Sequence, residues 1–499
     1  MQLLDLPLLV LEEILSHVPY DDSTTLSNLA RTSRSLYHLS VPRLYHTLQV
    51  VASGGKVGNR EVLRSPGWRW WGRKVVVTDG EEEGQNAVVA TEGENGDDDD
   101  GWAEVAEVVG GMEVGRLRDF KFISRKCAPA QTALSAALSK HSLRTLKLTM
   151  RPSSSSATNT ATATPAPVPA PVPAPVTDPA LTPAAPPPDP ILTCLTPTQH
   201  LTLQKLSINH IDPDDEPELI SMYTTLKLLP LTSLSLKSRA FTDLDYVPLP
   251  ELHPSTHLRS IKLYGFDIPP PEYCAETFFN PAYLRKLVLW ECRGFDTLLS
   301  YLSKGQSGSG THSRQLEELS LYTWEDVPDI EGVIAFISSC QRLKSVLLNL
   351  SSFTEAHMKS LIRALENSKG SLEYLTVQVR EPVTTRAMYY RPEWLSAFKG
   401  FVKMEWLGMN YEMKGLKLSN ITPTLPSCLK TLDIRLRGEL LAKPKTKAKV
   451  ITQTRGIGRA RRLLRDVLIN DGDYFETSWD LKVKRGEKVS VEEVEQSEP

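Results

Sequence analysis

The residues with the clearest potential for metal chemistry are two histidines in the segment HPSTH, His253 and His257. Two histidines at this separation on one helix face are common zinc ligands. Pro254 lies between them and argues against a shared helix face, because proline is disfavoured inside helices. No further ligand is evident nearby. We therefore interpret both as structural or surface histidines and expect no bound metal.

The cysteines and the short motifs give no catalytic site either. The cysteines have no paired spacing such as CxxC, which argues against a disulfide framework or a zinc site. We expect buried free thiols at Cys127, Cys194, Cys274, Cys292, Cys340 and Cys428. HExxH, GxSxG and P-loop motifs are absent, and GGKVGN and GQSGSG are interpreted as flexible loops. The sequence therefore predicts a protein that is not an enzyme and needs no cofactor.

Large aromatic side chains follow three copies of the pattern LxxLxL. Tyr264 follows LRSIKL, Trp290 follows LRKLVL and Tyr322 follows LEELSL. Tyrosine and tryptophan are among the residue types that most often anchor protein interfaces. If the three copies are neighbouring strands, the rings lie in register along one edge of a sheet. Two interpretations remain open: the rings bind a protein partner, or they pack on the loops that return to the helices.

The elements that would position these rings are repeats. LxxLxL begins at Leu203, Leu231, Leu258, Leu284, Leu316, Leu343, Leu372 and Leu429, with weaker copies at Leu117, Leu143 and Met404. Between Leu203 and Leu372, successive copies start 26 to 32 residues apart, close to the period of leucine-rich repeats. In LRKLVL, alternation places Leu287 and Leu289 on one side of a short strand.

The segments between these strands have helical patterns, as in DIEGVIAFISSC at 329–340 and TEAHMKSLIRALENSKG at 354–370. One strand and one helix cannot bury their apolar faces alone, so stacking neighbours would create a continuous core and a curved parallel sheet. The alternative is one large doubly wound α/β domain, which would have more variable strand spacing and β-branched runs.

Three stretches depart from the repeats. Residues 79–101 are acidic and rich in glycine, and residues 153–190 are rich in proline and alanine. Both compositions predict disordered insertions. Residues 438–499 form a tail that is first basic and then acidic. Its basic part is either a nuclear-import or nucleic-acid patch or, as we favour, a linker with a capping helix that carries Leu463, Leu464, Val467 and Leu468.

The first 48 residues are different again. After Pro7, apolar residues recur at helical spacing as far as Val18. Asp22 or Ser23 can cap a second short helix, and Ser33 can cap a third. Three short helices make a core that is too small to be stable by itself, so we expect this unit to be stabilised by a partner.

Membrane insertion is not expected. The first apolar stretch is interrupted by Glu12 and Glu13, unlike a signal peptide, and no segment approaches about 18 consecutive apolar residues. The formal net charge is −3, which argues against a nucleic-acid or membrane surface covering the whole protein. We expect the protein in the cytoplasm, the nucleus or both.

Over about its first 48 residues, the segment LPLLVLEEILSHVPYDDSTTLSNLARTSRSLYHLSVPRLYHTL resembles an F-box. The following array, up to about Arg437, resembles the leucine-rich-repeat substrate domains of fungal F-box proteins. The resemblance implies an α/β chain with a three-helix F-box at 1–48. A right-handed leucine-rich-repeat solenoid, or horseshoe, would follow at 49–437, interrupted by the two disordered insertions.

This resemblance implies the substrate-recognition subunit of an SCF-type cullin-RING ubiquitin ligase. The F-box would bind a Skp-type adaptor, and through it a cullin, by the apolar residues Leu6, Pro7, Leu11, Ile14, Leu15, Val18, Leu26, Leu29 and Leu36. An unknown protein substrate would bind at Tyr264, Trp290 and Tyr322. Two alternatives stay open. The leucines of the first helices would merely cap the solenoid, or the chain would be an F-box-like repeat scaffold that binds partners without recruiting the cullin.

Overall fold

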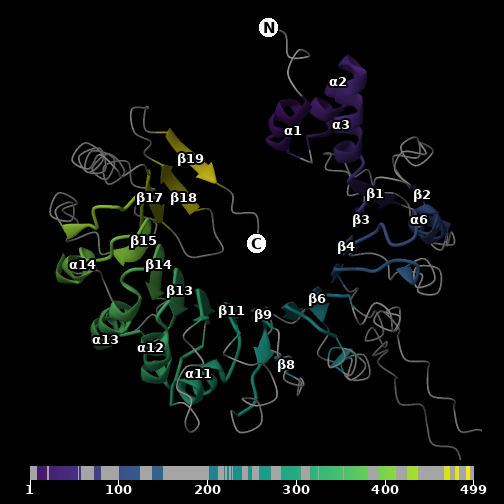
Figure 1. Cartoon of the computed structure of the whole chain (residues 1–499). Helices are drawn as coiled ribbons and strands as arrows, with labels where there is room; N and C mark the ends of the chain where they lie inside the picture. Colours follow the sequence, from purple (N-terminus) through teal and green to yellow (C-terminus); the bar gives the residue numbers. More distant parts are fainter. Residues whose placement is uncertain are drawn as a thin grey trace, which may run out of the picture. The chain divides into compact units, whose positions relative to one another are not determined.

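The computed structural model describes twenty-two stretches of the chain (Figure 1). They are residues 8–19, 22–53, 56–57, 72–79, 100–123, 138–149, 202–211, 219, 222–223, 226, 229–238, 246–249, 258–270, 283–304, 315–323, 325–351, 353–379, 392–411, 424–436, 466–471, 478–482 and 490–494. The chain divides into two compact units. Unit 1 comprises Met1–Leu203 and Ile208–Leu229, and unit 2 comprises Gln204–Ser207 and Pro230–Pro499.

Unit 1 begins with three helices, α1 (Leu8–Ser16), α2 (Ser23–Thr32) and α3 (Arg34–Leu44). The three-helix prediction is confirmed. Asp22 caps α2, because its side chain accepts a hydrogen bond from the Thr25 N–H at 3.0 Å. Ser33 caps α3 by accepting from the Leu36 N–H at 3.2 Å. Each cap satisfies a backbone donor that the helix itself leaves unpaired.

The rest of unit 1 contains a parallel sheet. Its strands are β1 (Thr47–Ser53), β3 (Lys74–Asp79), β4 (Asp119–Ile123) and β5 (Thr145–Thr149), in the order β5-β4-β3-β1. The short β2 (Lys56–Val57) pairs antiparallel with β1. Helix α6 (Asp100–Gly111) lies between β3 and β4 in the sequence. Strand β6 (Lys205–Ile211) contributes residues to both units.

Unit 2 contains an open parallel sheet. Its strands, in the order in which they lie side by side, are β7 (Ser233–Ser238), β9 (Ser260–Tyr264), β11 (Lys286–Trp290), β12 (Glu318–Tyr322), β13 (Ser345–Leu350), β14 (Tyr374–Val379), β15 (Trp406–Tyr411), β16 (Thr431–Leu436) and β17 (Asp466–Asp471). Strand order therefore follows sequence order. Two small pairs accompany it: β8 (Val247–Pro248) with β10 (Phe266–Asp267), and β18 (Ser478–Lys482) with β19 (Ser490–Val494).

Helices connect several of these strands. They are α11 (Phe295–Lys304), α12 (Ile330–Ser339), α13 (Glu355–Leu365) with the 3-10 turn η5 (Glu366–Ser368), and α14 (Pro392–Phe398). The helices predicted at 329–340 and 354–370 are confirmed by α12 and α13. Neighbouring helices pack in sequence, α11 on α12 and α12 on α13.

The leucines of the repeated pattern form the core of unit 2. Leu284, Leu287 and Leu289 of LRKLVL are all buried. The predicted alternation therefore places Leu287 and Leu289 inward, and the neighbouring Lys286 and Trp290 stay half-buried on the other face. Such burial of leucine side chains is the main favourable contribution to folding.

The tail and the insertions lie only partly within the described residues. Val467 and Leu468 belong to β17, which pairs with β16, so they lie in a strand and the capping helix predicted for them is wrong at these positions. A strand beside an open sheet edge satisfies that edge's backbone hydrogen bonds, which a helix cannot do. Asp79 ends β3, and Asp100 and Gly101 begin α6. Residues 80–99, 153–190 and 437–465 lie outside the described residues.

Within the described ranges, no helix combines the length and the apolar character that crossing a membrane requires.

Candidate functional site

The three aromatic residues singled out in the sequence form one column on the sheet of unit 2. Tyr264, Trp290 and Tyr322 are the last residues of β9, β11 and β12, and each lies opposite the next in the strand register. The ring centroids of Tyr264 and Trp290 are 5.6 Å apart, and those of Trp290 and Tyr322 are 4.8 Å apart. Both distances lie in the range in which aromatic pairs attract. The predicted register is therefore confirmed, and the binding role of the column stays a prediction.

Main-chain hydrogen bonds hold the strand ends that carry the column. The Gly265 N–H donates to the Trp290 carbonyl at 2.9 Å, and the Glu291 N–H donates to the Tyr322 carbonyl at 2.7 Å. Tyr264 and Trp290 are half-buried, whereas Tyr322 is buried. Burial and then the neighbouring Cys292 raise the pKa of Tyr264, so its hydroxyl stays protonated at neutral pH and can act as a hydrogen-bond donor.

Polar residues continue the column on the next two strands. Asn349 of β13 lies opposite Tyr322, and Gln378 of β14 lies opposite Asn349. Asn349 is only 1% exposed, and neither its Nδ2 nor its Oδ1 has a hydrogen-bond partner among the described residues. A buried amide without a partner destabilises the free protein. The sequence pattern marks this position as part of the column but does not indicate that it is buried.

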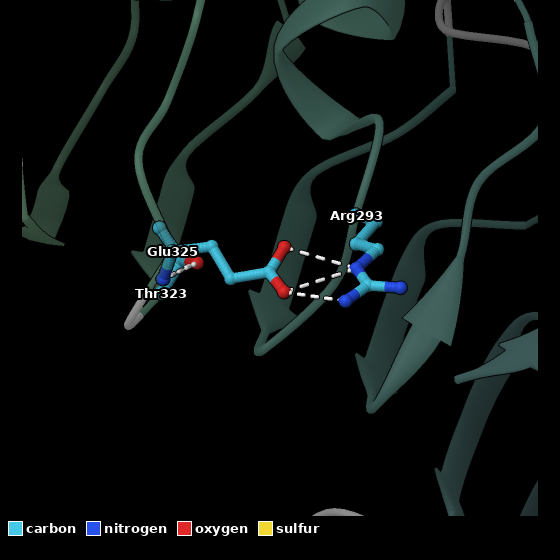
Figure 2. A network of polar contacts seen from close by, with 3 residues as sticks. All are labelled: Arg293, Thr323 and Glu325. Atoms are coloured by element: carbon cyan, nitrogen blue, oxygen red, sulfur yellow. Dashed lines mark hydrogen bonds and ion pairs between the residues drawn. The ribbon is translucent and has the colours of Figure 1, made fainter. Parts of the chain in front are cut away.

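The loops after β11 and β12 are joined by a charged cluster (Figure 2). The guanidinium group of Arg293 donates to both carboxylate oxygens of Glu325, at 2.6 to 3.0 Å. It also lies 4.0 Å above the ring of Tyr246, a cation–π contact. The Glu325 N–H donates to the Thr323 hydroxyl at 3.1 Å. This cluster fixes the two loops that directly follow the aromatic column.

The same contacts set the ionisation of the cluster. The hydrogen bond from Arg293 holds the pKa of Glu325 below its ordinary value, and the hydrogen bond to Glu325 raises the pKa of Arg293. Burial and the charge of Glu325 raise the pKa of Tyr246 to about 12. At neutral pH the cluster is therefore an ion pair beside a protonated tyrosine. Sequence analysis missed it, because Arg293 and Glu325 are 32 residues apart and neither belongs to LxxLxL.

The potential metal ligands in the part of the chain that the structure describes do not assemble into a site. Among the described residues, no three His, Cys, Asp or Glu side chains are placed to hold a metal ion. Cys292 and Cys340 are buried free thiols, as predicted, and Cys428 is a half-buried one. Burial raises the pKa of Cys292 to about 12, which makes its thiol unreactive. His253, His257, Cys127, Cys194 and Cys274 lie outside the described residues.

The second candidate site is the three-helix unit at the start of the chain. Leu11, Leu15, Leu26 and Leu36 form its core, with Val18, Leu29, Leu39 and Leu44 packed against it. The Arg43 guanidinium donates to the Val18 carbonyl at 2.9 Å, which ties α3 to the end of α1. A few apolar side chains remain outside this core: Val10, Ile14 and Tyr37 are exposed.

The family model for the F-box domain matches residues 3–42. The chain therefore carries an F-box. No curated protein matches the chain. F-box domains in general bind Skp-type adaptors, and proteins that contain them are generally non-catalytic substrate receptors.

The residues predicted to bind the adaptor occupy different positions in this F-box. Leu11, Leu15, Leu26 and Leu36 are buried inside it, and Val18 and Leu29 are partly buried. Ile14 is 42% exposed. Leu6 and Pro7 lie outside the described residues. In the free chain, only Ile14 of these described residues presents a well-exposed side chain to a partner.

Sequence analysis did not identify Val10 as a surface residue, although its helical spacing to Ile14 could have indicated it. Val10 precedes Ile14 by one helical turn, so the two share a face of α1, and Val10 is 41% exposed. Helical periodicity places both near the apolar face but does not say which apolar residues point inward. Packing in the F-box core buries Leu11 and Leu15 and leaves Val10 and Ile14 exposed.

Proposed function

We propose that this protein is the substrate-recognition subunit of an SCF-type cullin-RING ubiquitin ligase. The observation that carries the proposal is an F-box at residues 3–42 in the same chain as a parallel sheet with a column of aromatic side chains. The F-box would bind a Skp-type adaptor, and the adaptor would bring the cullin. The column would hold a protein substrate. The location of such a complex would be cytoplasmic, nuclear or both.

We interpret residues 49–437 as leucine-rich repeats between the F-box at 1–48 and a tail at 438–499. Three features support this interpretation. The strands follow one another in sequence order and pair in parallel, the LxxLxL leucines are buried, and the connecting helices α11, α12 and α13 pack on one another. Stacked strand–helix units of this kind offer a long surface suited to a folded partner.

The exposed side chains of α1 support adaptor binding. Val10 and Ile14 share one helix face and are exposed, while Leu11 and Leu15 support them from the core. Apolar surface of this kind contributes about 25 cal/mol per Å² when it is removed from water. We expect Ile14→Asp to abolish co-purification of the adaptor while the F-box stays folded. Undiminished adaptor binding by a folded Ile14→Asp variant would contradict this assignment.

The aromatic column supports substrate binding, since tyrosine and tryptophan are among the residues that most often anchor protein interfaces. Tyr264→Ala, Trp290→Ala and Tyr322→Ala should each reduce partner recruitment without loss of adaptor binding. Tyr374→Ala is a matched control: Tyr374 is exposed on β14, at the opposite end of its strand from the column. If the three variants and the control recruit partners equally, the rings serve only to pack the loops.

The proposed mechanism requires no catalytic residue in this chain. A receptor holds a substrate lysine near a conjugating enzyme supplied by other subunits, which raises the effective concentration of the reacting groups. This role is consistent with the unreactive thiol of Cys292.

One experiment separates the proposal from the alternative of a repeat scaffold that does not recruit the cullin. The tagged full chain is purified from cells, and its partners are identified by mass spectrometry. Recovery of adaptor and cullin together supports the ligase receptor. Recovery of adaptor without cullin supports the scaffold, and recovery of neither with a folded F-box overturns both.

A further inference from the structure

A cluster of positive charge lies on the sheet of unit 1. Arg73, Arg118 and Arg144 directly precede β3, β4 and β5, and all three are exposed. The Arg118 N–H donates to the Arg73 carbonyl at 2.9 Å, and the Arg144 N–H donates to the Arg118 carbonyl at 2.7 Å. The three arginines therefore occupy successive equivalent positions along one end of the sheet.

Three lysines continue the cluster on the face of the sheet. Lys121 of β4 lies opposite Lys147 of β5 in the register, and Lys74 of β3 lies opposite Asp119, two residues before Lys121. Neighbouring strands are only about 4.8 Å apart, so like charges at opposite positions repel. Burial and then the charges of Lys147 and Lys74 lower the pKa of Lys121. We call these six residues, Arg73, Lys74, Arg118, Lys121, Arg144 and Lys147, the basic surface.

At three successive equivalent positions of unit 2 the charges alternate, although Arg259, which directly precedes β9, has the same sign as Arg285. Arg285, Glu317 and Lys344 directly precede β11, β12 and β13, linked by the same kind of main-chain hydrogen bond at 2.8 and 2.7 Å. There Glu317 pairs with Arg285 at 3.3 Å and with Lys344 at 2.7 Å.

Two further pairs repeat this arrangement: Lys286 with Glu318, and Lys430 with Glu405 at 2.5 Å. By contrast, none of the six cations of the basic surface forms an ion pair with any residue that the structure describes.

The basic surface therefore has a positive net charge among the residues that the structure describes. At the start of β11, β12 and β13 the same sheet geometry pairs opposite charges. At the start of β3, β4 and β5 it gathers like charges, and Asp119 is the one acid among these described positions. We propose that the basic surface binds an acid-rich peptide segment of a partner protein. The inference goes beyond the proposed function, because this surface contains neither the exposed residues of α1 nor the aromatic column.

A peptide fits this surface better than a nucleic acid does. Single-stranded nucleic acids bind where exposed aromatic rings stack on the bases beside the positive charge. Among the described residues of β3, β4 and β5, the aromatic ones are Phe120 and Phe122, and both are buried in the core. Carboxylates, in contrast, are matched by the fork of an arginine guanidinium group, and three arginines lie in succession here.

The test measures the affinity of a fluorescent glutamate-rich peptide for the full chain, which keeps all of its own Asp and Glu residues. The same peptide with glutamine in place of glutamate is the neutral probe. Single-stranded oligothymidine is the nucleic-acid probe. We expect the acidic peptide to bind, with an affinity that falls as salt rises, and the neutral peptide not to bind.

Variants localise the binding. Lys121→Gln with Lys147→Gln should weaken acidic-peptide binding by about fivefold to thirtyfold. Lys344→Gln with Lys430→Gln removes two cations that are already paired and should leave binding within about twofold of wild type. Lys121→Gln with Lys147→Gln also removes the repulsion between the two lysines. The melting temperature of this double variant should therefore equal or exceed that of wild type.

Three outcomes would overturn the inference: no binding of the acidic peptide, equal losses in the two double variants, or tighter binding of oligothymidine than of the peptide. Adaptor co-purification, measured on the same samples, reports on the F-box separately. Failure of this inference is therefore distinguishable from failure of the proposed function.

Discussion

Asn349 of β13 and Tyr322 of β12 lie opposite each other in the strand register. Tyr322 is the last ring of the aromatic column, and the next position holds the buried amide of Asn349. Neither the nitrogen nor the oxygen of that amide forms a hydrogen bond with any part of the chain that the structure describes. The two residues therefore have opposite consequences for the free protein: the ring contributes packing, and the unpaired amide costs stability. A bound main chain, which offers both a donor and an acceptor, would relieve that cost.

Replacing this amide should stabilise the free protein. We expect Asn349→Leu to raise the free energy of unfolding by about 1 kcal/mol, because a buried polar group without a partner is removed. Urea denaturation measures the change. The matched control is Asn209→Leu, since Asn209 occupies the same position relative to LxxLxL but is half-buried. A loss of stability in Asn349→Leu, or an equal gain in the control, would contradict the prediction.

Ile14 and Leu15 are adjacent in α1 but should respond differently to truncation. Leu15 is 3% exposed and lies in the F-box core, so Leu15→Ala should destabilise the F-box by about 2–5 kcal/mol. Ile14→Ala should cost less than about 1 kcal/mol, because 42% of its surface is already exposed to water. Limited proteolysis of the F-box region compares the two. Equal protease sensitivity would mean that Ile14 is packed as Leu15 is.

The stability that the Arg293–Glu325 pair contributes should depend on pH. The pKa of Glu325 is lowered in the folded state, so the contribution is complete above the ordinary pKa of glutamate. It is lost as pH falls through the lowered folded value. We expect Glu325→Gln to cost about 0.5–1 kcal/mol at pH 7, with a smaller difference from wild type at pH 3. Denaturation at both pH values measures it.

The control for this prediction is Glu107→Gln, since Glu107 is exposed on α6. Its substitution should leave stability unchanged at both pH values. A difference between wild type and Glu325→Gln that is equally large at pH 7 and pH 3 would show that packing, and not charge, holds the two loops together.

The turn that follows Arg293 should be intolerant of any side chain. Gly294 has a φ of +68°, and a Cβ there would meet the Ile268 carbonyl oxygen at 2.3 Å. Gly294→Ala should therefore cost more than about 1 kcal/mol. Gly115→Ala is the informative comparison, because Gly115 also has a positive φ, +77°, but open space around it. Equal costs in chemical denaturation would mean that φ strain alone, without the clash, explains the effect.

Sequence alone determined the local elements of this protein. The spacing of LxxLxL predicted strands with Leu287 and Leu289 inward, and the register of Trp290 with its aromatic neighbours followed from the same spacing. The candidate caps, Asp22 or Ser23 for the second helix and Ser33 for the third, predicted where α2 and α3 begin. These features depend on side-chain periodicity and on backbone groups a few residues apart, which one stretch of sequence contains.

Only the tertiary structure decided which side chains are paired, buried or exposed. Periodicity gave Ile14 and Leu15 the same apolar character, and packing of α1 against its neighbours separated them. The Arg293–Glu325 pair joins the loops after β11 and β12, and Lys121 and Lys147 lie opposite each other on β4 and β5; in both cases the residues are far apart in the chain. The physical reason is that register brings such residues within reach of one another, and register is set by the whole sheet and not by any single repeat.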